Sequence, residues 1–321
     1  MGFSDEYRAL AAKVSNRGRW GDDDQRGTLN LVDAAATLRG VQAARKGLTF
    51  SLAVELRENG VQMGQPAGRF NPMLTPTSLN ERDQHAPGIW EGTDDLVTMS
   101  TCAGTHVDAL SHVGYDNELY GGRDQRETVR ARGGAKELGV EHVGPVVTRG
   151  LLVDVPRTRG IDEMEPGDPV TADDLHAAIA AAGLTVEPGD MVCVRTGDIR
   201  HYHRGDRKRY AMGVEWNTCG LGVSCVEWFR DRDIAGVFLD CYTYEVMPPE
   251  PVPGKDVNWD DLMVVHLLQL RDMGMLQGQN WDFEALAEDC AGDGVAEFML
   301  VVAPEPIVGA TSGPVHPVAV K

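Results

Sequence analysis

The chain alternates between stretches with helical and with strand-like spacing of apolar residues, and the helices are the easier to recognise. Near the start, Tyr7, Leu10, Ala11 and Val14 recur at the three- and four-residue intervals of one helix face, and Ser4 is a suitable N-cap. Amphipathic spacing or capping residues predict further helices over residues 33–46, 171–183, 226–231, 260–273 and 282–290.

Short apolar or alternating runs between these helices predict β-strands. They cover residues 48–56, 96–99, 146–155, 191–195, 234–239 and 298–302. The run over 146–155 is compatible with two short strands or with one bulged strand. Because strands and helices alternate, the chain is predicted to be an α/β protein.

The stretch from Arg57 to Glu91 is different, because it is rich in Gly, Pro, Asn and Thr and has no clear period. We therefore predict a long loop there, and loops of that length in compact domains are often functional lids. Phe70 and Trp90 are its candidate substrate contacts, although aromatic residues without a pattern are as often loop anchors.

The length of 321 residues is enough for a large core. Because no linker divides the sequence, we predict a single domain over 1–321 with an N-terminal helical extension over about residues 1–46.

A net charge of −19 argues against nucleic acid and anionic membrane surfaces as partners. No run reaches the roughly 20 apolar residues of a membrane helix, and the charged start does not suit a secretory signal, so a cytoplasmic location is expected. The six cysteines are dispersed without a Cys-x2-Cys pair, which argues against disulfides and against a structural zinc knuckle.

Residues that could bind a metal are concentrated between Ser100 and His112. A strand is predicted at their start, and alternate side chains of a strand share a face, so His106 and Asp108 are expected to point the same way. Gly104 permits a bulge, and His112 could return to the same place after a turn. Imidazole and carboxylate groups suit zinc, manganese or iron at positions that leave room for water. Taken alone, this spacing is more often that of a hydrogen-bonded pair at a strand end.

The identity of the residues changes this interpretation. Cys102-Ala-Gly-Thr-His-Val-Asp-Ala-Leu-Ser-His112 resembles the His-x-Gly-Thr-His-x-Asp-x3-His signature of the cyclase family, which includes bacterial kynurenine formamidases and isatin hydrolases. Trp20-Gly-Asp-Asp-Asp24 is similar to a segment of the longer, actinobacterial-type branch of that family. The resemblance implies the swivelling β/β/α fold of the family and a homodimer or homotetramer.

The resemblance extends downstream and departs from the family pattern at two places. Cys102 stands where the family has its first histidine, and Gln279 stands where a glutamate is expected. His266 alone would be interpreted as a core histidine, but it matches the family's downstream histidine. Asp240 and Glu245 follow a buried strand as comparable acids do in the family, and the sequence leaves their role open between function and structure.

For the metal site, the resemblance suggests His106 and Asp108 as ligands of a divalent metal, zinc or manganese. Cys102 is a candidate thiolate ligand, because a thiol beside a bound cation is readily deprotonated. The alternative is that Cys102 is only a small buried residue. Gln279 is a candidate neutral ligand.

His112 is predicted to be the general base or acid, because a histidine exchanges protons near neutral pH. His266 is predicted to be a second metal ligand or a proton carrier. The chain has no Gly-x-Ser-x-Gly elbow, and a metal-activated water removes the need for a side-chain nucleophile. The leading prediction is an enzyme that hydrolyses a cyclic or acyl amide or a lactone, with a small molecule as its substrate. Two alternatives stay open: a natural-product cyclase or dehydratase that uses the metal as a Lewis acid, and a binding protein on a degenerate site.

Overall fold

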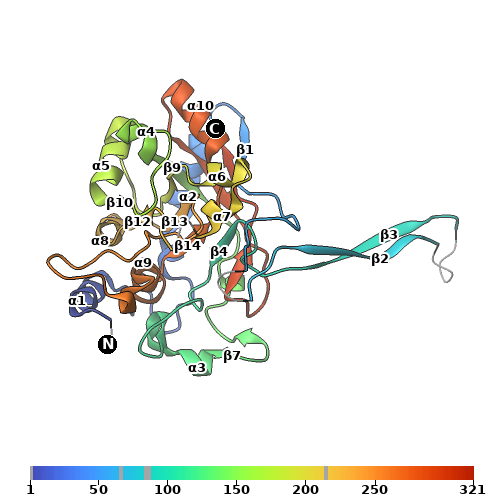
Figure 1. Ribbon diagram of the computed structural model, residues 1–321, viewed down its shortest axis with the longest axis horizontal. Helices are drawn as coiled ribbons and strands as arrows, with labels where there is room; N and C mark the ends of the chain where they lie inside the picture. The colour runs from blue at the N-terminus through green and yellow to red at the C-terminus, as the bar shows by residue number, and fades with distance from the viewer. Residues whose placement is uncertain (1–2, 65–67, 83–87, 213–215) are drawn as a thin grey trace.

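The computed structural model describes residues 3–64, 68–82, 88–212 and 216–321. Its centre is a nine-stranded sheet in which segments far apart in the sequence lie side by side (Figure 1). The strand order is β1 (Thr49–Ser51), β17 (Val318–Val320), β15 (Glu297–Val302), β9 (Val146–Asp154), β11 (Met191–Arg195), β13 (Gly236–Leu239), β14 (Leu276–Gln279), β4 (His106–Asp108) and β16 (Ser312–Pro314). Strands β9, β11, β13 and β14 are parallel to one another, and β15 and β4 run antiparallel on either side of them.

The parallel strands are buried on both faces, because their side chains alternate between two cores. Val192 and Val194 of β11 belong to one core, whereas Met191 and Cys193 belong to the other. The larger helices packed around the sheet are α1 (Asp5–Val14), α2 (Ala34–Ala43), α5 (Ala172–Ala181), α8 (Ser224–Asp231) and α10 (Glu284–Asp293). Near-continuous apolar runs are typical of parallel strands covered on both sides. The prediction of an α/β protein is confirmed.

Several predicted elements form with close to the expected bounds. Strand β11 covers the predicted residues, and α5 begins with a capping box formed by Thr171 and Asp174. The run over 146–155 forms one continuous strand, β9, rather than two. Gly150, inside this strand, leaves room for a neighbouring ring, because a Cβ atom there would lie 2.3 Å from a ring carbon of Phe298. The strand predicted over 48–56 is limited to β1.

The helix predicted over 260–273 is wrong at its start, because it begins at Val264. Met263 adopts a left-handed φ of 64°, which interrupts the helix between residues 261 and 264. The carboxylate of Glu245 then caps the new helix start by accepting the N–H groups of Val265 and His266. The segment consists of the 3-10 turn η4 (Trp259–Asp261), the short helix α9 (Val264–His266) and the π-type helix η5 (Leu267–Met273). The interruption places His266 next to a capping carboxylate.

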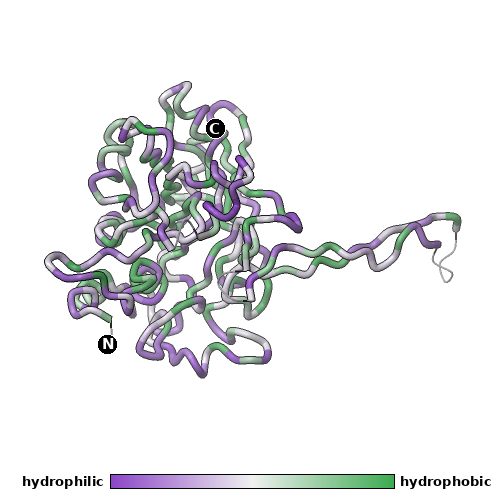
Figure 2. Tube along the Cα trace, in the orientation of Figure 1, coloured by the Kyte–Doolittle hydropathy of each residue, from purple (hydrophilic) through white to green (hydrophobic). Residues whose placement is uncertain are grey.

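Part of the predicted loop is instead a long β-hairpin arm. Strand β2 (Met73–Glu81) pairs antiparallel with β3 (Gly92–Thr98), and the hairpin projects away from the body of the molecule (Figure 1). The prediction of a loop over 57–91 is therefore wrong for residues 73–81. Because both faces of the arm are exposed, its residues show no inside–outside period, and apolar and polar positions are mixed along it (Figure 2). Its exposed apolar side chains are Met73, Leu74, Leu79, Ile89, Trp90, Leu96 and Val97.

A surface of this kind is typical of contact with another protein. The homodimer or homotetramer stays a prediction.

Helix α1 lies against the body near α8, where Lys13 pairs with Glu227. No helix within the described ranges is long and apolar enough to cross a membrane.

Candidate functional site

Two of the predicted ligands lie on one short strand inside the sheet. Strand β4 runs between β14 and β16, and its three residues are buried. As expected for alternate residues of a strand, His106 and Asp108 share a face, with 3.7 Å between His106 Nε2 and Asp108 Oδ1. The other ring nitrogen, Nδ1, lies 2.8 Å from the carbonyl oxygen of Gly104. Because a carbonyl oxygen can only accept, Nδ1 carries the proton and Nε2 keeps a lone pair directed at the cluster.

His112 returns to the same carboxylate through a tight turn. Its backbone N–H donates to the carbonyl oxygen of Ala109 at 2.9 Å, and its Nε2 atom lies 3.7 Å from Asp108 Oδ1. Its side chain is 15% exposed, whereas those of His106 and Asp108 are 1% and 0% exposed. The cluster is therefore open to solvent on the side of His112.

His266 approaches the second oxygen of Asp108 from helix α9. Its Nε2 atom lies 4.0 Å from Asp108 Oδ2, and its Nδ1 atom bonds to the carboxylate of Glu245. The same carboxylate accepts the backbone N–H of Val265 at 2.9 Å. Glu245 thus fixes the orientation of the His266 ring, and it is a positioning residue.

Asp240, the other acid whose role the sequence left open, lies apart from these contacts. Its carboxylate accepts the N–H of Thr196 at 2.8 Å, the hydroxyl of Thr196 at 2.7 Å and the N–H of Gly197 at 2.8 Å. These bonds hold the turn that follows β11, so its contacts are structural.

Gln279 fills the space between Asp108 and His266. In the register of the sheet, Gln279 faces His106 and Gln277 faces Asp108 on the adjacent strand. The Nε2 atom of Gln279 donates to Asp108 Oδ2 at 2.9 Å and lies 2.8 Å from Nε2 of His266, while Gln277 donates to the same Asp108 oxygen at 3.2 Å. A carboxylate only accepts, so the NH2 group of Gln279 must face it. In this arrangement Gln279 is a hydrogen-bond donor, and its role as a neutral ligand stays a prediction.

Three buried atoms of the cluster have no hydrogen-bond partner among the described residues: His112 Nδ1, and the facing pair His106 Nε2 and Asp108 Oδ1. The separation of 3.7 Å within this pair is too long for a hydrogen bond. It is close to the ~3.4 Å between two atoms that each lie about 2.1 Å from a tetrahedral zinc ion. Burying such atoms without a partner is costly, so the pair fits a divalent cation. In the described part of the chain, no three His, Cys, Asp or Glu side chains form a complete metal-binding group. Further coordination would fall to water or substrate.

The charge states of the cluster also suit a cation. Burial lowers the pKa of both His106 and His112 below the ordinary value. Burial alone would raise the pKa of Asp108, but the neighbouring His112 and His106, together with the amide of Gln277, hold it below its ordinary range. Neutral imidazoles and an ionised carboxylate at neutral pH are the forms that bind metals.

Cys102 is buried within electrostatic reach of Asp108, but its thiol is not activated by the chain alone. Burial raises the pKa of Cys102, and Asp108 adds to this rise. Its backbone carbonyl accepts a hydrogen bond from the side chain of Gln62 at 2.8 Å. The thiolate ligand stays a prediction that requires a bound cation.

The two aromatic residues predicted near the substrate lie in different places. Phe70 is 40% exposed and lies beside the ligand-rich stretch, because its N–H donates to Ser100 Oγ at 2.9 Å. Trp90 packs against Gly92, the residue at which β3 begins, and its contact with substrate stays a prediction. Arg69, the residue before Phe70, belongs to a stretch without periodicity and was not singled out, and its positive charge adds to the effect of burial in lowering the pKa of His106 and His112.

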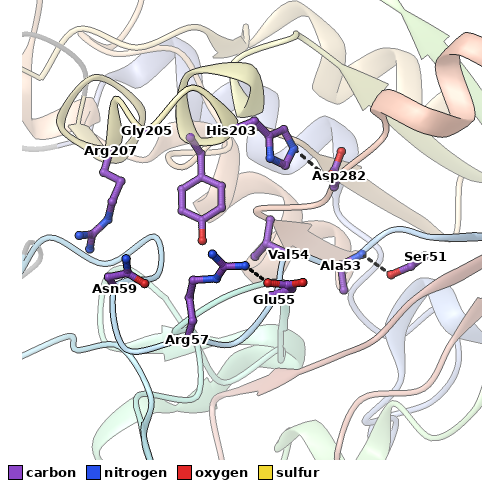
Figure 3. Close-up of a pocket in the computed structure, with 11 residues that line it drawn as sticks. Ser51, Ala53, Val54, Glu55, Arg57, Asn59, His203, Gly205, Arg207 and Asp282 are labelled. Atoms are coloured by element: carbon purple, nitrogen blue, oxygen red, sulfur yellow. Dashed lines mark hydrogen bonds and ion pairs between the residues drawn. The ribbon is translucent and has the colours of Figure 1, made fainter.

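A separate cavity of about 550 Å³ lies near the α6 (Ile199–His203) and α7 (Arg207–Met212) segment (Figure 3). Its lining includes Arg57, which pairs with Glu55, and His203, whose Nε2 atom lies 2.8 Å from Asp282. None of the residues around Asp108 lines it, so it is distinct from the cluster.

Comparison with known proteins decides the family. The Cyclase family model matches residues 48–246. The chain belongs to the cyclase family. A crystal structure described as a novel cyclase is 32% identical to this cyclase-family protein, with a TM-score of 0.84 over 97% of this chain and 99% of that chain. A search of curated proteins finds no match.

The fold is shared more widely. Isatin hydrolase A from Labrenzia aggregata, bound to benzyl benzoate, is 18% identical with a TM-score of 0.60 over 87% of this chain and 94% of that chain. An isatin hydrolase bound to the product analogue thioisatinate is also 18% identical, with a TM-score of 0.59 over 89% and 98%. The predicted family and its swivelling β/β/α fold are therefore confirmed. Membership of the cyclase family supports a role as a hydrolase or cyclase.

Proposed function

We propose that this cyclase-family protein is a metal-dependent hydrolase of a cyclic or acyl amide or a lactone. The observation that carries the proposal is the buried pair of unpartnered atoms, His106 Nε2 and Asp108 Oδ1, at 3.7 Å. The shared fold with isatin hydrolases supports the same reaction class, because isatin is a cyclic amide.

His106 and Asp108 would hold the cation, which is zinc or manganese in this proposal, and Cys102 is the candidate for a further ligand. When bound, such a cation polarises a carbonyl group and lowers the pKa of a bound water to about 7. The carbonyl oxygen of Gly104 keeps the lone pair of His106 on the atom that faces Asp108. The chain thus orients a ligand atom before any metal arrives.

His112 is the proton carrier in this proposal. It is the solvent-accessible histidine of the cluster, and its Nε2 atom lies on the same side of Asp108 as His106. Burial lowers its pKa, so it is neutral at pH 7 and able to accept a proton from water. The proton can then pass to the departing nitrogen or oxygen when the acyl bond breaks.

The alternative of a binding protein on a degenerate site draws on a different observation. Gln279 donates toward both Asp108 and His266, which stabilises these two side chains without a metal. A cyclase or dehydratase that uses the metal as a Lewis acid would need the same His106–Asp108 pair.

Metal analysis combined with a substrate panel tests these readings. Zinc- or manganese-loaded protein is incubated with N-formyl aromatic amides, isatin-like lactams and lactones, and product acids are followed by mass spectrometry. Hydrolysis that is lost in EDTA and returns with metal supports the proposal. Loaded protein that hydrolyses none of these compounds would favour the Lewis-acid cyclase, and protein that cannot be loaded would favour the binding protein.

A further inference from the structure

The segment that carries α6 and α7 is a basic stretch in an acidic chain. Residues 200–209 contain four arginines and one lysine against one carboxylate, whereas the whole chain has a net charge of −19. Arg204 of this stretch has an acidic partner, Glu163, at 2.8 Å. Arg207 differs, because no carboxylate in the described ranges lies within ion-pair distance of its guanidinium.

Two backbone carbonyl groups hold the guanidinium of Arg207 in place. Its Nε atom donates to the carbonyl oxygen of Gly60 at 2.7 Å, and its Nη2 atom donates to the carbonyl oxygen of Gln62 at 3.0 Å. A guanidinium has five N–H donors, so these two bonds fix its orientation and leave donors for a ligand. A carbonyl group has no net charge, so the positive charge of Arg207 is not neutralised by these partners.

The guanidinium of Arg207 belongs to the lining of the cavity of about 550 Å³. Arg207 and the exposed Asn59 point toward one another at this cavity (Figure 3). Ala53, Val54 and Tyr202 give the same cavity an apolar wall. A cavity of this size that combines apolar walls with a few convergent polar groups is typical of a site for a small organic molecule.

The other charged groups of the cavity cancel in pairs. Arg57 pairs with Glu55, and Nε2 of His203 lies 2.8 Å from a carboxylate oxygen of Asp282. The hydrogen bond with Asp282 raises the pKa of His203, which favours the protonated ring and hence an ion pair. The charge of Arg207 is therefore left over, and the cavity favours a negatively charged ligand.

We propose that this cavity binds a small organic molecule through an oxyanion, a carboxylate or a phosphate group, held by Arg207 and Asn59. The planar fork of a guanidinium matches both groups, and the amide of asparagine adds a further donor. The apolar wall that includes Val54 contacts the rest of the molecule. None of the residues around Asp108 lines the cavity, so this binding requires neither a metal nor hydrolysis and goes beyond the proposed function.

Benzoate, phenyl phosphate and the neutral benzamide test the proposal, because they share a phenyl ring and differ in charge. Saturation-transfer NMR titrations give their affinities for wild type, Arg207→Gln and Arg204→Gln. Chelator treatment, followed by dialysis into a buffer without carboxylate or phosphate, prevents the anions from binding a metal. Arg204 is the matched control, because it lies in the same stretch, pairs with Glu163 and does not line the cavity.

Wild type and Arg204→Gln should bind at least one of the two anions about 10-fold to 100-fold more tightly than benzamide, as for a charge-assisted contact. Arg207→Gln should bind the three compounds equally. A preference for benzoate alone supports a carboxylate ligand, and a preference for phenyl phosphate alone supports a phosphate ligand. Asn59→Asp should also lose the preference, because its carboxylate repels the anion and pairs with Arg207.

The second variant keeps the test decisive if Arg207→Gln does not fold, because Asn59 is exposed and its replacement leaves the carbonyl contacts of Arg207 intact. Equal affinities for the three compounds in wild type, or no binding of either anion, would overturn the proposal. A preference that survives in folded Arg207→Gln or in Asn59→Asp would do the same. Loss of the preference in Arg204→Gln as well would mean that the anions respond to the charge of the whole stretch, which contradicts a site at Arg207.

Discussion

Gln279→Glu tests whether the amide of Gln279 stands where an anionic ligand would bind a cation. In the wild-type chain, its Nε2 atom lies 2.9 Å from an oxygen of Asp108 and 2.8 Å from Nε2 of His266. A glutamate here places a second carboxylate at a similar distance from Asp108, where two charges repel by about 6 kcal/mol at an effective dielectric constant of about 20. Keeping a glutamic acid protonated at pH 7 costs less, about 4 kcal/mol. In the metal-free variant, the carboxyl group introduced at position 279 is therefore expected to be protonated at pH 7.

This cost sets the expected loss of stability. Metal-free Gln279→Glu should have a free energy of unfolding about 4 kcal/mol below that of wild type at pH 7. With about 2.1 cal/mol/K of unfolding entropy for each of the 321 residues, Tm should fall by roughly 6 °C. A divalent cation can replace the proton, so zinc at about 100 times its Kd should restore about 2.7 kcal/mol. Differential scanning fluorimetry in EDTA and with added zinc measures both changes.

Gln279→Met is the control, because it removes both N–H donors without adding a charge or a ligand. It should lose stability in EDTA and gain no more from zinc than wild type gains. If zinc stabilises Gln279→Glu no more than Gln279→Met, position 279 does not adjoin a cation site and the reasoning is refuted.

Three further predictions concern the site and its support. His112→Ala should keep its metal while turnover falls by about 10² to 10⁴, whereas Asp108→Ala should lose metal; identical behaviour in metal analysis and kinetics would refute the separation of base from ligand. If Cys102 binds as a thiolate, Cys102→Ser should weaken zinc affinity, and peroxide should release metal from wild type but not from the variant, as measured with a zinc-sensitive dye. Asp190→Asn removes the 2.7 Å partner of Arg149, which keeps Glu297 at 3.0 Å, so chemical denaturation should show a loss of about 1 to 3 kcal/mol, and no measurable loss would contradict the pairing.

The sequence was sufficient where the signal is local. The alternation of a strand correctly places His106 and Asp108 on one face, because residues two apart in a strand share a side whatever surrounds them. The return of His112 likewise depends on a turn of a few residues. Strand β11 was predicted with its bounds because a buried parallel strand is apolar throughout.

The sequence was insufficient where a contact joins distant segments or where no face is buried. The bridging position of Gln279 depends on the pairing of β14 with β4, which no local pattern encodes. Glu245 positions His266 by capping a helix that begins only because Met263 is left-handed. The β2–β3 hairpin was not predicted, because both of its faces are exposed and its apolar residues therefore show no period.

Metal content tests the proposed function most directly. Inductively coupled plasma mass spectrometry of protein purified without chelator should find close to one zinc or manganese ion per chain, because Gln279 offers Asp108 a donor where a second cation would need an anionic ligand. The same measurement should find the ion absent from Asp108→Ala. Wild-type protein that contains no transition metal, and that takes up neither zinc nor manganese on reconstitution, would contradict the proposed hydrolase.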